Sequence, residues 1–158
     1  MTLAIKPAPV KKTLTVAAAP ARAFEVFTAG FGRWWPATHS IGESPLKLAV
    51  IEPGIGGRWY GLLEDGSENP WGDVLAWEPP TRLVLAWRIS ADWSYDPELL
   101  TEVEVVFTAE GEGTRVDLEH RHLERMGDGA ETARASFDSD GGWGGLLRMF
   151  AAEAAKAS

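Results

Sequence analysis

The chain has 158 residues, of which eight are Trp and none is Cys, and its 15 basic and 23 acidic side chains give a formal net charge of −8. The absence of Cys excludes disulfides, thiolate nucleophiles and Cys-ligated zinc, and it fits a reducing, cytoplasmic location. No basic stripe indicates a nucleic-acid partner, no apolar run is long enough to span a membrane, and residues 1–7 do not resemble the start of a secretory signal. A chain of this length is expected to form one domain, residues 1–158, with a sizeable core.

The first part of the chain predicts one strand and two short helices. Residues 10–16 mix β-branched and polar side chains, as strands do. Pro20 is tolerated in the first turn of a helix and Gly30 is a typical helix end, so a helix is expected between them. Residues 31–35 predict a second short helix, which Pro36 stops.

Period-two alternation then predicts an antiparallel meander of short strands. The expected strands are residues 46–51, 58–63, 71–77, 83–89, 101–108 and 114–121. In the last two strands apolar side chains alternate with charged ones, which predicts one buried face and one wet face. A tight Pro-Pro turn is expected to place Val74 and Ala76 on the same face as Leu83.

The end of the chain predicts a long amphipathic helix. Apolar side chains recur at spacings of 3, 1, 3, 1 and 3 at Trp143, Leu146, Leu147, Phe150, Ala151 and Ala154. This is the pattern of a helix with one buried side, and we expect it to lie across the buried face of the sheet. The charged residues 122–140 before it predict a loop with one helical turn.

Several segments resemble, in the same order, those of START-like (SRPBCC) proteins. They are FEVFTAGFGRWWP at residues 24–36, EPGIGGRWY at 52–60, DG at 65–66, WGDVLAWEPPTRLVLAW at 71–87, TEVEVVF at 101–107, TRVDLEH at 114–120 and GWGGLL at 142–147. Within that superfamily the chain is most similar to homologues of the C-terminal domain of the activator of the heat-shock-protein-ninety ATPase. The resemblance implies an α+β helix-grip fold: a curved antiparallel sheet wrapped around a long C-terminal helix, two short helices after the first strand, and an internal cavity.

The tryptophans are the main candidates for a ligand site. Eight indole rings are hard to pack as a solid core, because each buried N–H needs a partner. The residues predicted to bind a ligand are Trp34, Trp35, Trp59, Trp87, His120, Trp143 and Leu147. Arg58 and Arg88 are candidate polar anchors, with protein carboxylates as their alternative partners. Trp93, in a polar stretch, is expected to lie on a flap over the cavity.

His120 is the one histidine with a predicted role. It continues the apolar face of Leu118, so it is either a polar group at the pocket mouth or a structural residue at the end of a core strand. His122 shares that strand face, but a metal site needs further ligands, so no metal is expected. The sequence contains neither a P-loop nor a nucleophile elbow, so no catalytic centre and no cofactor are predicted.

Three functions remain compatible with the sequence. The first, our working hypothesis, is a binding module without catalysis for a small hydrophobic or aromatic molecule. The second is a co-chaperone-like domain that binds a chaperone or another protein, which needs an exposed apolar patch. The third is an enzyme like the polyketide cyclases among START-like folds, with His120 as acid or base. The chain is expected to be a monomer or a homodimer.

Overall fold

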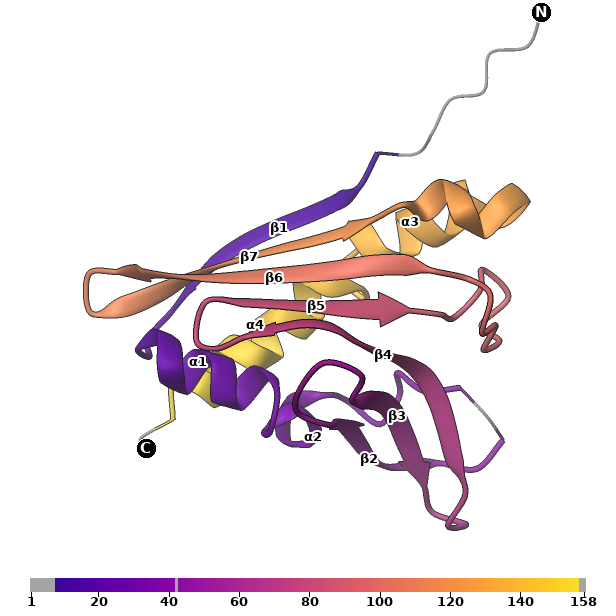
Figure 1. Ribbon diagram of the computed structural model, residues 1–158, viewed down its shortest axis with the longest axis horizontal. Helices are drawn as coiled ribbons and strands as arrows, with labels where there is room; N and C mark the ends of the chain where they lie inside the picture. The colour runs from indigo at the N-terminus through magenta and orange to yellow at the C-terminus, as the bar shows by residue number, and fades with distance from the viewer. Residues whose placement is uncertain (1–7, 42, 157–158) are drawn as a thin grey trace, which may run out of the picture.

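The computed structural model describes residues 8–41 and 43–156, so residues 1–7, on which the expectation of no secretory signal rests, lie outside it. Its centre is a seven-stranded antiparallel sheet with the strand order β1-β7-β6-β5-β4-β3-β2 (Figure 1). The strands are β1 (Val10–Val16), β2 (Leu46–Ile51), β3 (Arg58–Leu63), β4 (Glu68–Glu78), β5 (Arg82–Trp87), β6 (Thr101–Glu110) and β7 (Gly113–Arg121). The helices are α1 (Pro20–Phe27), α2 (Phe31–Trp34), the 3₁₀ helix η1 (Leu123–Gly129), α3 (Ala130–Asp138) and α4 (Trp143–Ala154).

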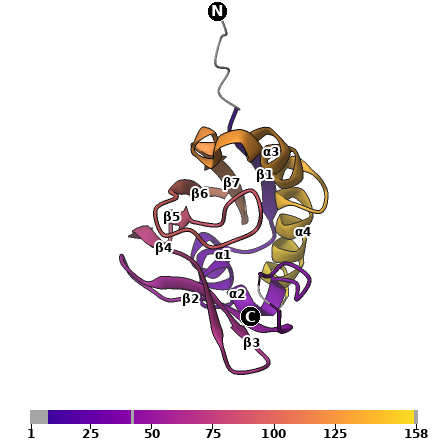
Figure 2. The same ribbon diagram turned by 90° about the vertical axis from the view of Figure 1, so that its right-hand side faces the viewer.

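This arrangement confirms the helix-grip fold predicted from the sequence. Strands β2 to β7 follow one another as a meander, and β1 pairs with β7 at the edge of the sheet. The short helices α1 and α2 connect β1 to β2, as predicted. Figure 2 shows the sheet curled, with α4 on its inner side, where α4 contacts α1, α2 and β1.

The last hairpin shows why the two faces of the sheet differ. Val105 and Leu118 point inward and are buried. On the other face Arg121 lies 2.8 Å from Glu102 and 3.0 Å from Glu104. Partly exposed ion pairs of this kind contribute only about 0.2–1 kcal/mol each. The burial of the apolar face is therefore what fixes the orientation of these strands.

The apolar stripe of α4 is buried, as its spacing predicted. Trp143, Leu146, Leu147, Phe150 and Ala154 all lie in the core, and Ala151 is half-buried at its edge. The ring centroid of Phe150 lies 5.2 Å from that of Phe27 in α1 and 5.4 Å from that of Trp34 in α2. The helix thus packs against both short helices as well as the sheet. No helix among the described residues is long and apolar enough to cross a membrane.

Strand β4 differs from its prediction in length and in register. It begins at Glu68 instead of residue 71. A bulge between Val74 and Ala76 reverses the alternation of side chains, so that Trp77 and not Ala76 lies opposite Leu83. The prediction that Val74 and Ala76 share one face is therefore wrong, because a regular alternation cannot reveal an extra residue in the strand.

Residues 122–140 contain more helix than the sequence predicted. The expected loop is instead η1 followed by the nine-residue helix α3. Helix α3 buries Ala130, Ala133 and Phe137 on one side and contacts β1 and α4. The prediction was wrong because glycines and charged residues hide this short apolar stripe.

Candidate functional site

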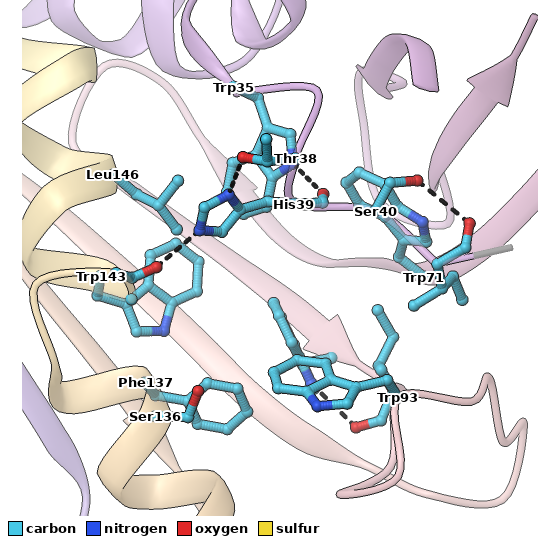
Figure 3. A pocket seen from close by; sticks show the side chains of 15 residues that line it. Trp35, Thr38, His39, Ser40, Trp71, Trp93, Ser136, Phe137, Trp143 and Leu146 are labelled. Atoms are coloured by element: carbon cyan, nitrogen blue, oxygen red, sulfur yellow. Dashed lines mark hydrogen bonds between the residues drawn. The ribbon is translucent and has the colours of Figure 1, made fainter. Parts of the chain in front are cut away.

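A pocket of about 340 Å³ opens between α3, the start of α4 and the loop that follows α2 (Figure 3). It is lined by Trp35, Thr38, His39, Ser40, Ile41, Trp71, Trp87, Ile89, Trp93, Ser136, Phe137, Gly141, Gly142, Trp143 and Leu146. Small-molecule sites commonly measure about 300–1,000 Å³ and combine apolar walls with a few polar groups. This pocket has both the size and that composition.

Tryptophan rings from separate elements contribute to the wall. Trp35 directly follows α2, Trp71 and Trp87 stand on the neighbouring strands β4 and β5, and Trp143 is the first residue of α4. The ring centroid of Trp143 lies 6.0 Å from that of Trp35 and 5.9 Å from that of Trp87, both edge to face. Aromatic pairs prefer this geometry, so the rings hold one another in place before any ligand arrives.

Trp93 lies at the outer side of the pocket. It belongs to the loop between β5 and β6, its φ of 65° is unusual for a bulky residue, and it is 50% exposed. Its ring packs edge-on against Phe137, with 6.0 Å between the centroids. Trp93 is thus a residue of the pocket wall, and the flap itself stays a prediction.

The indole N–H groups tie the wall to the rest of the protein. Trp35 donates to the backbone carbonyl of His39 at 2.7 Å, and Trp87 donates to the backbone carbonyl of Ile89 at 3.0 Å. Trp143 donates to Nδ1 of His120 at 3.2 Å. Because an indole has only one donor, these three rings present apolar faces and edges to the pocket.

His120 stands behind this wall and does not line the pocket. Its side chain is fully buried and its ring stacks on Phe137, with 4.6 Å between the centroids. Since Trp143 donates to Nδ1, the ring hydrogen is on Nε2, which donates to Oγ1 of Thr101 at 2.9 Å. Thr101 in turn donates to the carbonyl of Trp87 at 3.0 Å. This chain of hydrogen bonds links the ring of Trp143 to the backbone of Trp87 from behind the pocket wall.

Burial also decides the charge of His120. Desolvation lowers the pKa of its imidazole to about 3, so the ring is neutral at pH 7. Both ring nitrogens are already occupied by protein partners. Of the two positions that the sequence left open, the structure places His120 at the end of a core strand and not at the pocket mouth.

His39 supplies the polar side of the pocket. Its Nε2 lies 2.6 Å from the carbonyl oxygen of Gly141, and because a carbonyl has no hydrogen to give, Nε2 carries the ring hydrogen. In this tautomer Nδ1 is the acceptor, and the hydroxyl of Thr38 donates to it at 3.0 Å. Among the described residues that line the pocket, His39 is the one with an acid–base side chain.

The family model described as Activator of Hsp90 ATPase homolog 1-like protein matches residues 17–155. The chain belongs to this family. The match agrees with the START-like resemblance seen in the sequence, and it covers the helices, the strands from β2 to β7 and the residues that line the pocket.

Several solved structures are similar to this chain in sequence or in fold. The anthrahydroquino-γ-pyrone synthase Txn09, solved in complex with SUM, is 39% identical with a TM-score of 0.65, covering 91% of this chain and 95% of Txn09. The self-sacrificing resistance protein CalC from Micromonospora echinospora is 35% identical with a TM-score of 0.69, covering 92% and 93%. PFC0360w, an Hsp90 activator from Plasmodium falciparum, is 20% identical with a TM-score of 0.50, covering 72% and 71%, and shares only the fold. No curated protein matches the sequence.

The seven residues predicted from the sequence to bind a ligand fall into two groups. Trp35, Trp87 and Trp143 line the pocket. Trp34, Trp59, His120 and Leu147 are buried and do not line it. Trp59 packs behind Trp87, with 5.5 Å between the ring centroids. These core residues support the wall instead of forming it.

The two candidate polar anchors bind carboxylates of the protein and do not line the pocket. Arg58 lies 2.9 Å from Glu52 and 3.0 Å from Glu68, and its hydrogen bonds hold the pKa of Glu52 below its usual value. Arg88 lies 2.7 Å from Asp73. Both arginines therefore have the intramolecular carboxylate partners that the sequence offered as the alternative.

Sequence reasoning did not single out His39 or Trp71 as pocket residues. His39 lies in a loop without periodicity, and its partner Gly141 comes 102 residues later. One signal was available, because Pro36 stops α2 and so fixes where the loop with His39 begins. Trp71 falls in a predicted strand, but alternation alone does not tell which side of the cavity a strand residue reaches.

The histidines of β7 and its end do not form a metal site. His122, expected on the same strand face as His120, lies beyond the end of β7 and is partly exposed. Across residues 8–41 and 43–156, no group of three or more His, Cys, Asp or Glu side chains is arranged to hold a metal ion.

Proposed function

We propose that this chain binds a flat, polycyclic aromatic molecule in the pocket lined by Trp35, Trp71, Trp87, Trp93 and Trp143. The observation that carries the proposal is the wall itself: indole rings from separate elements surround a space of about 340 Å³. Internal hydrogen bonds occupy the N–H groups of Trp35, Trp87 and Trp143. Their rings are thereby left to stack on, or meet edge-on, another aromatic system.

The relatives support this choice of ligand class. Txn09, at 39% identity over nearly the whole chain, is named as an anthrahydroquino-γ-pyrone synthase, and that name contains a fused aromatic ring system. A fused ring system is flat and largely apolar, which fits a site with aromatic walls and one polar side. We further propose that residues 1–158 act as one cytoplasmic domain, as a monomer or a homodimer.

A co-chaperone role, in which the chain would bind a chaperone, is the weaker alternative. The family description and the shared fold of PFC0360w support it. Protein docking needs a continuous exposed apolar patch. The large exposed apolar side chains of the described residues, Leu48, Ile55, Trp93, Tyr95 and Met149, come from separate places: β2, the turn before β3, the β5–β6 loop and α4.

A second candidate function is catalysis on the bound ring system. The specific observation in its favour is His39, an acid–base side chain in the polar side of the pocket. The 39% sequence identity to Txn09, which is named as a synthase, also supports a catalytic function. In this version of the proposal the pocket binds the same class of molecule and also moves one of its protons.

Anthraquinone-2-sulfonate is expected to quench the Trp fluorescence of the protein saturably. A micromolar Kd, about −8 kcal/mol, is expected for a site of this kind. Ser136→Trp, which adds a bulky ring to a residue of the pocket wall, is expected to weaken binding at least about tenfold. Ala135→Trp adds the same ring at the neighbouring exposed position outside the pocket and should leave Kd unchanged.

Two results would contradict the binding function. One is the absence of saturable quenching, confirmed by calorimetry, with a panel of fused-ring probes. The other is an equal loss of affinity in the two Trp variants, which would place the probe away from the pocket. Melting curves of both variants identify any loss of affinity that comes only from unfolding.

A further inference from the structure

We propose that His39 is the proton-accepting residue of the pocket and that, through Thr38, it acts on a phenolic hydroxyl group of the bound polycyclic molecule. This inference rests on the proposed binding function and deepens it, because it names the chemical group that the pocket recognises. It gives His39 the acid–base role that the sequence offered for His120.

Two protein groups fix the ring of His39 from opposite sides. The carbonyl oxygen of Gly141, 2.6 Å from Nε2, keeps the ring hydrogen on that nitrogen and leaves Nδ1 as the basic one. The hydroxyl of Thr38 lies 3.0 Å from Nδ1. Figure 3 shows Thr38 beside the ring of His39 and marks the hydrogen bond between them with a dashed line. A hydroxyl, a base and a group that orients the base form the arrangement that activates a hydroxyl for proton transfer.

The proton transfer is complete without any further reactant. Thr38 donates its own hydrogen to Nδ1, and its oxygen keeps lone pairs that accept a hydrogen bond from a ligand hydroxyl. When the phenolic O–H bond breaks, its proton goes to Oγ1 of Thr38, and the hydrogen of Thr38 passes to Nδ1. The products are a phenolate and an imidazolium, whose two N–H groups donate to Thr38 and to Gly141.

The surroundings of the pocket make His39 the acceptor. Of the described residues that line it, none is a carboxylate, lysine, arginine or tyrosine. His120 is behind the wall, with both nitrogens bonded to other groups. Asp140, next to Gly141, is 94% exposed and lies 3.7 Å from Arg148, so solvent screens its charge. The start of α4 at Gly142 also lines the pocket, and the positive end of its dipole favours a phenolate there.

A pair of probes separates this inference from the binding function. 2-Hydroxyanthraquinone has a phenolic proton and changes colour from yellow to red on ionisation, and 2-methoxyanthraquinone has the same ring system without that proton. At a pH where the free phenol is neutral, the hydroxy probe is expected to show the ionised spectrum when bound to the wild-type protein. His39→Gln keeps a donor for Gly141 but has no basic nitrogen, so its bound probe should stay yellow. Its affinity for the hydroxy probe should fall roughly tenfold to hundredfold, as for one lost hydrogen bond to a charged group.

The controls assign each outcome. The methoxy probe should lose much less affinity on His39→Gln than the hydroxy probe does, and the difference between the two losses measures the contribution of the phenolic proton. His122→Gln, a change of a histidine outside the pocket, should keep the ionised spectrum. If the methoxy probe binds but the bound hydroxy probe stays neutral in the wild-type protein, or ionises equally in His39→Gln, the role of His39 is overturned and the binding function stands. If neither probe binds, both proposals are overturned.

Discussion

Replacing Phe150 by Ala is expected to lower the free energy of unfolding by about 3–5 kcal/mol, as for other fully buried aromatic side chains. Phe150 has no exposed surface, and its ring packs against those of Phe27 and Trp34 at centroid distances of 5.2 and 5.4 Å. The large loss has two parts. Removal of the ring loses its transfer free energy, and the surrounding helices cannot collapse fully into the cavity that remains. Urea melts at pH 7 measure the difference.

Met149→Ala is the matched control for this change. Met149 is the preceding residue of the same helix, but it is 45% exposed. Its truncation is expected to change the free energy of unfolding by less than about 1 kcal/mol, since it removes few buried contacts. A loss below about 1 kcal/mol for Phe150→Ala as well would contradict the assignment of the α4 stripe to the core.

The sequence predicted correctly those helices and strands in which the buried side chains recur at a regular spacing. The stripe from Trp143 to Ala154 and the alternation around Val105 and Leu118 are repeated patterns, and a repeated pattern defines which side faces the core. Alternation failed where the chain adds one residue without a turn signal, at the bulge between Val74 and Ala76. It failed again in α3, where the stripe is only a few residues long.

The sequence did not reveal which residues line the pocket. The abundance of Trp predicted an internal aromatic cavity, which stays a prediction, and Trp35, Trp87 and Trp143 are among the residues that line the pocket. His39 could not be predicted, because its place depends on the meeting of an irregular loop with the start of α4. Side chains such as Trp34 could not be sorted from wall residues, since the sequence shows that a ring is buried but not whether it has a space in front of it.

His120 illustrates the same limit for a polar residue. Its position after Leu118 correctly placed it on the inner face of β7. Whether that position was the pocket mouth or the core depended on Phe137, whose ring stacks on it from a helix where the sequence predicts a loop. The partners of a buried polar group come from distant segments, so its role is decided by tertiary structure.

Replacing His120 by Phe is expected to destabilise the protein at pH 7 by about 1–3 kcal/mol. Phe keeps the size and the stacking on Phe137, but the N–H of Trp143 loses its acceptor and Thr101 loses a donor. A buried polar group without a partner carries its full desolvation penalty. Urea melts of the wild-type protein and the variant at pH 7 give this first difference.

The stability advantage of the wild-type protein over His120→Phe is expected to shrink as the pH falls. Burial lowers the pKa of His120 from its ordinary 6.5 to about 3, so between these values the unfolded chain binds a proton that the folded protein does not. The contribution of His120 to stability is therefore present above pH 6.5 and is lost as the pH falls toward 3. Between pH 7 and pH 5 the wild-type protein should lose about 2 kcal/mol more than His120→Phe, which has no such group. The advantage of the wild-type protein should thus shrink to near zero or reverse at pH 5, whereas an equal stability difference at both pH values would show that His120 does not stay neutral in the folded protein.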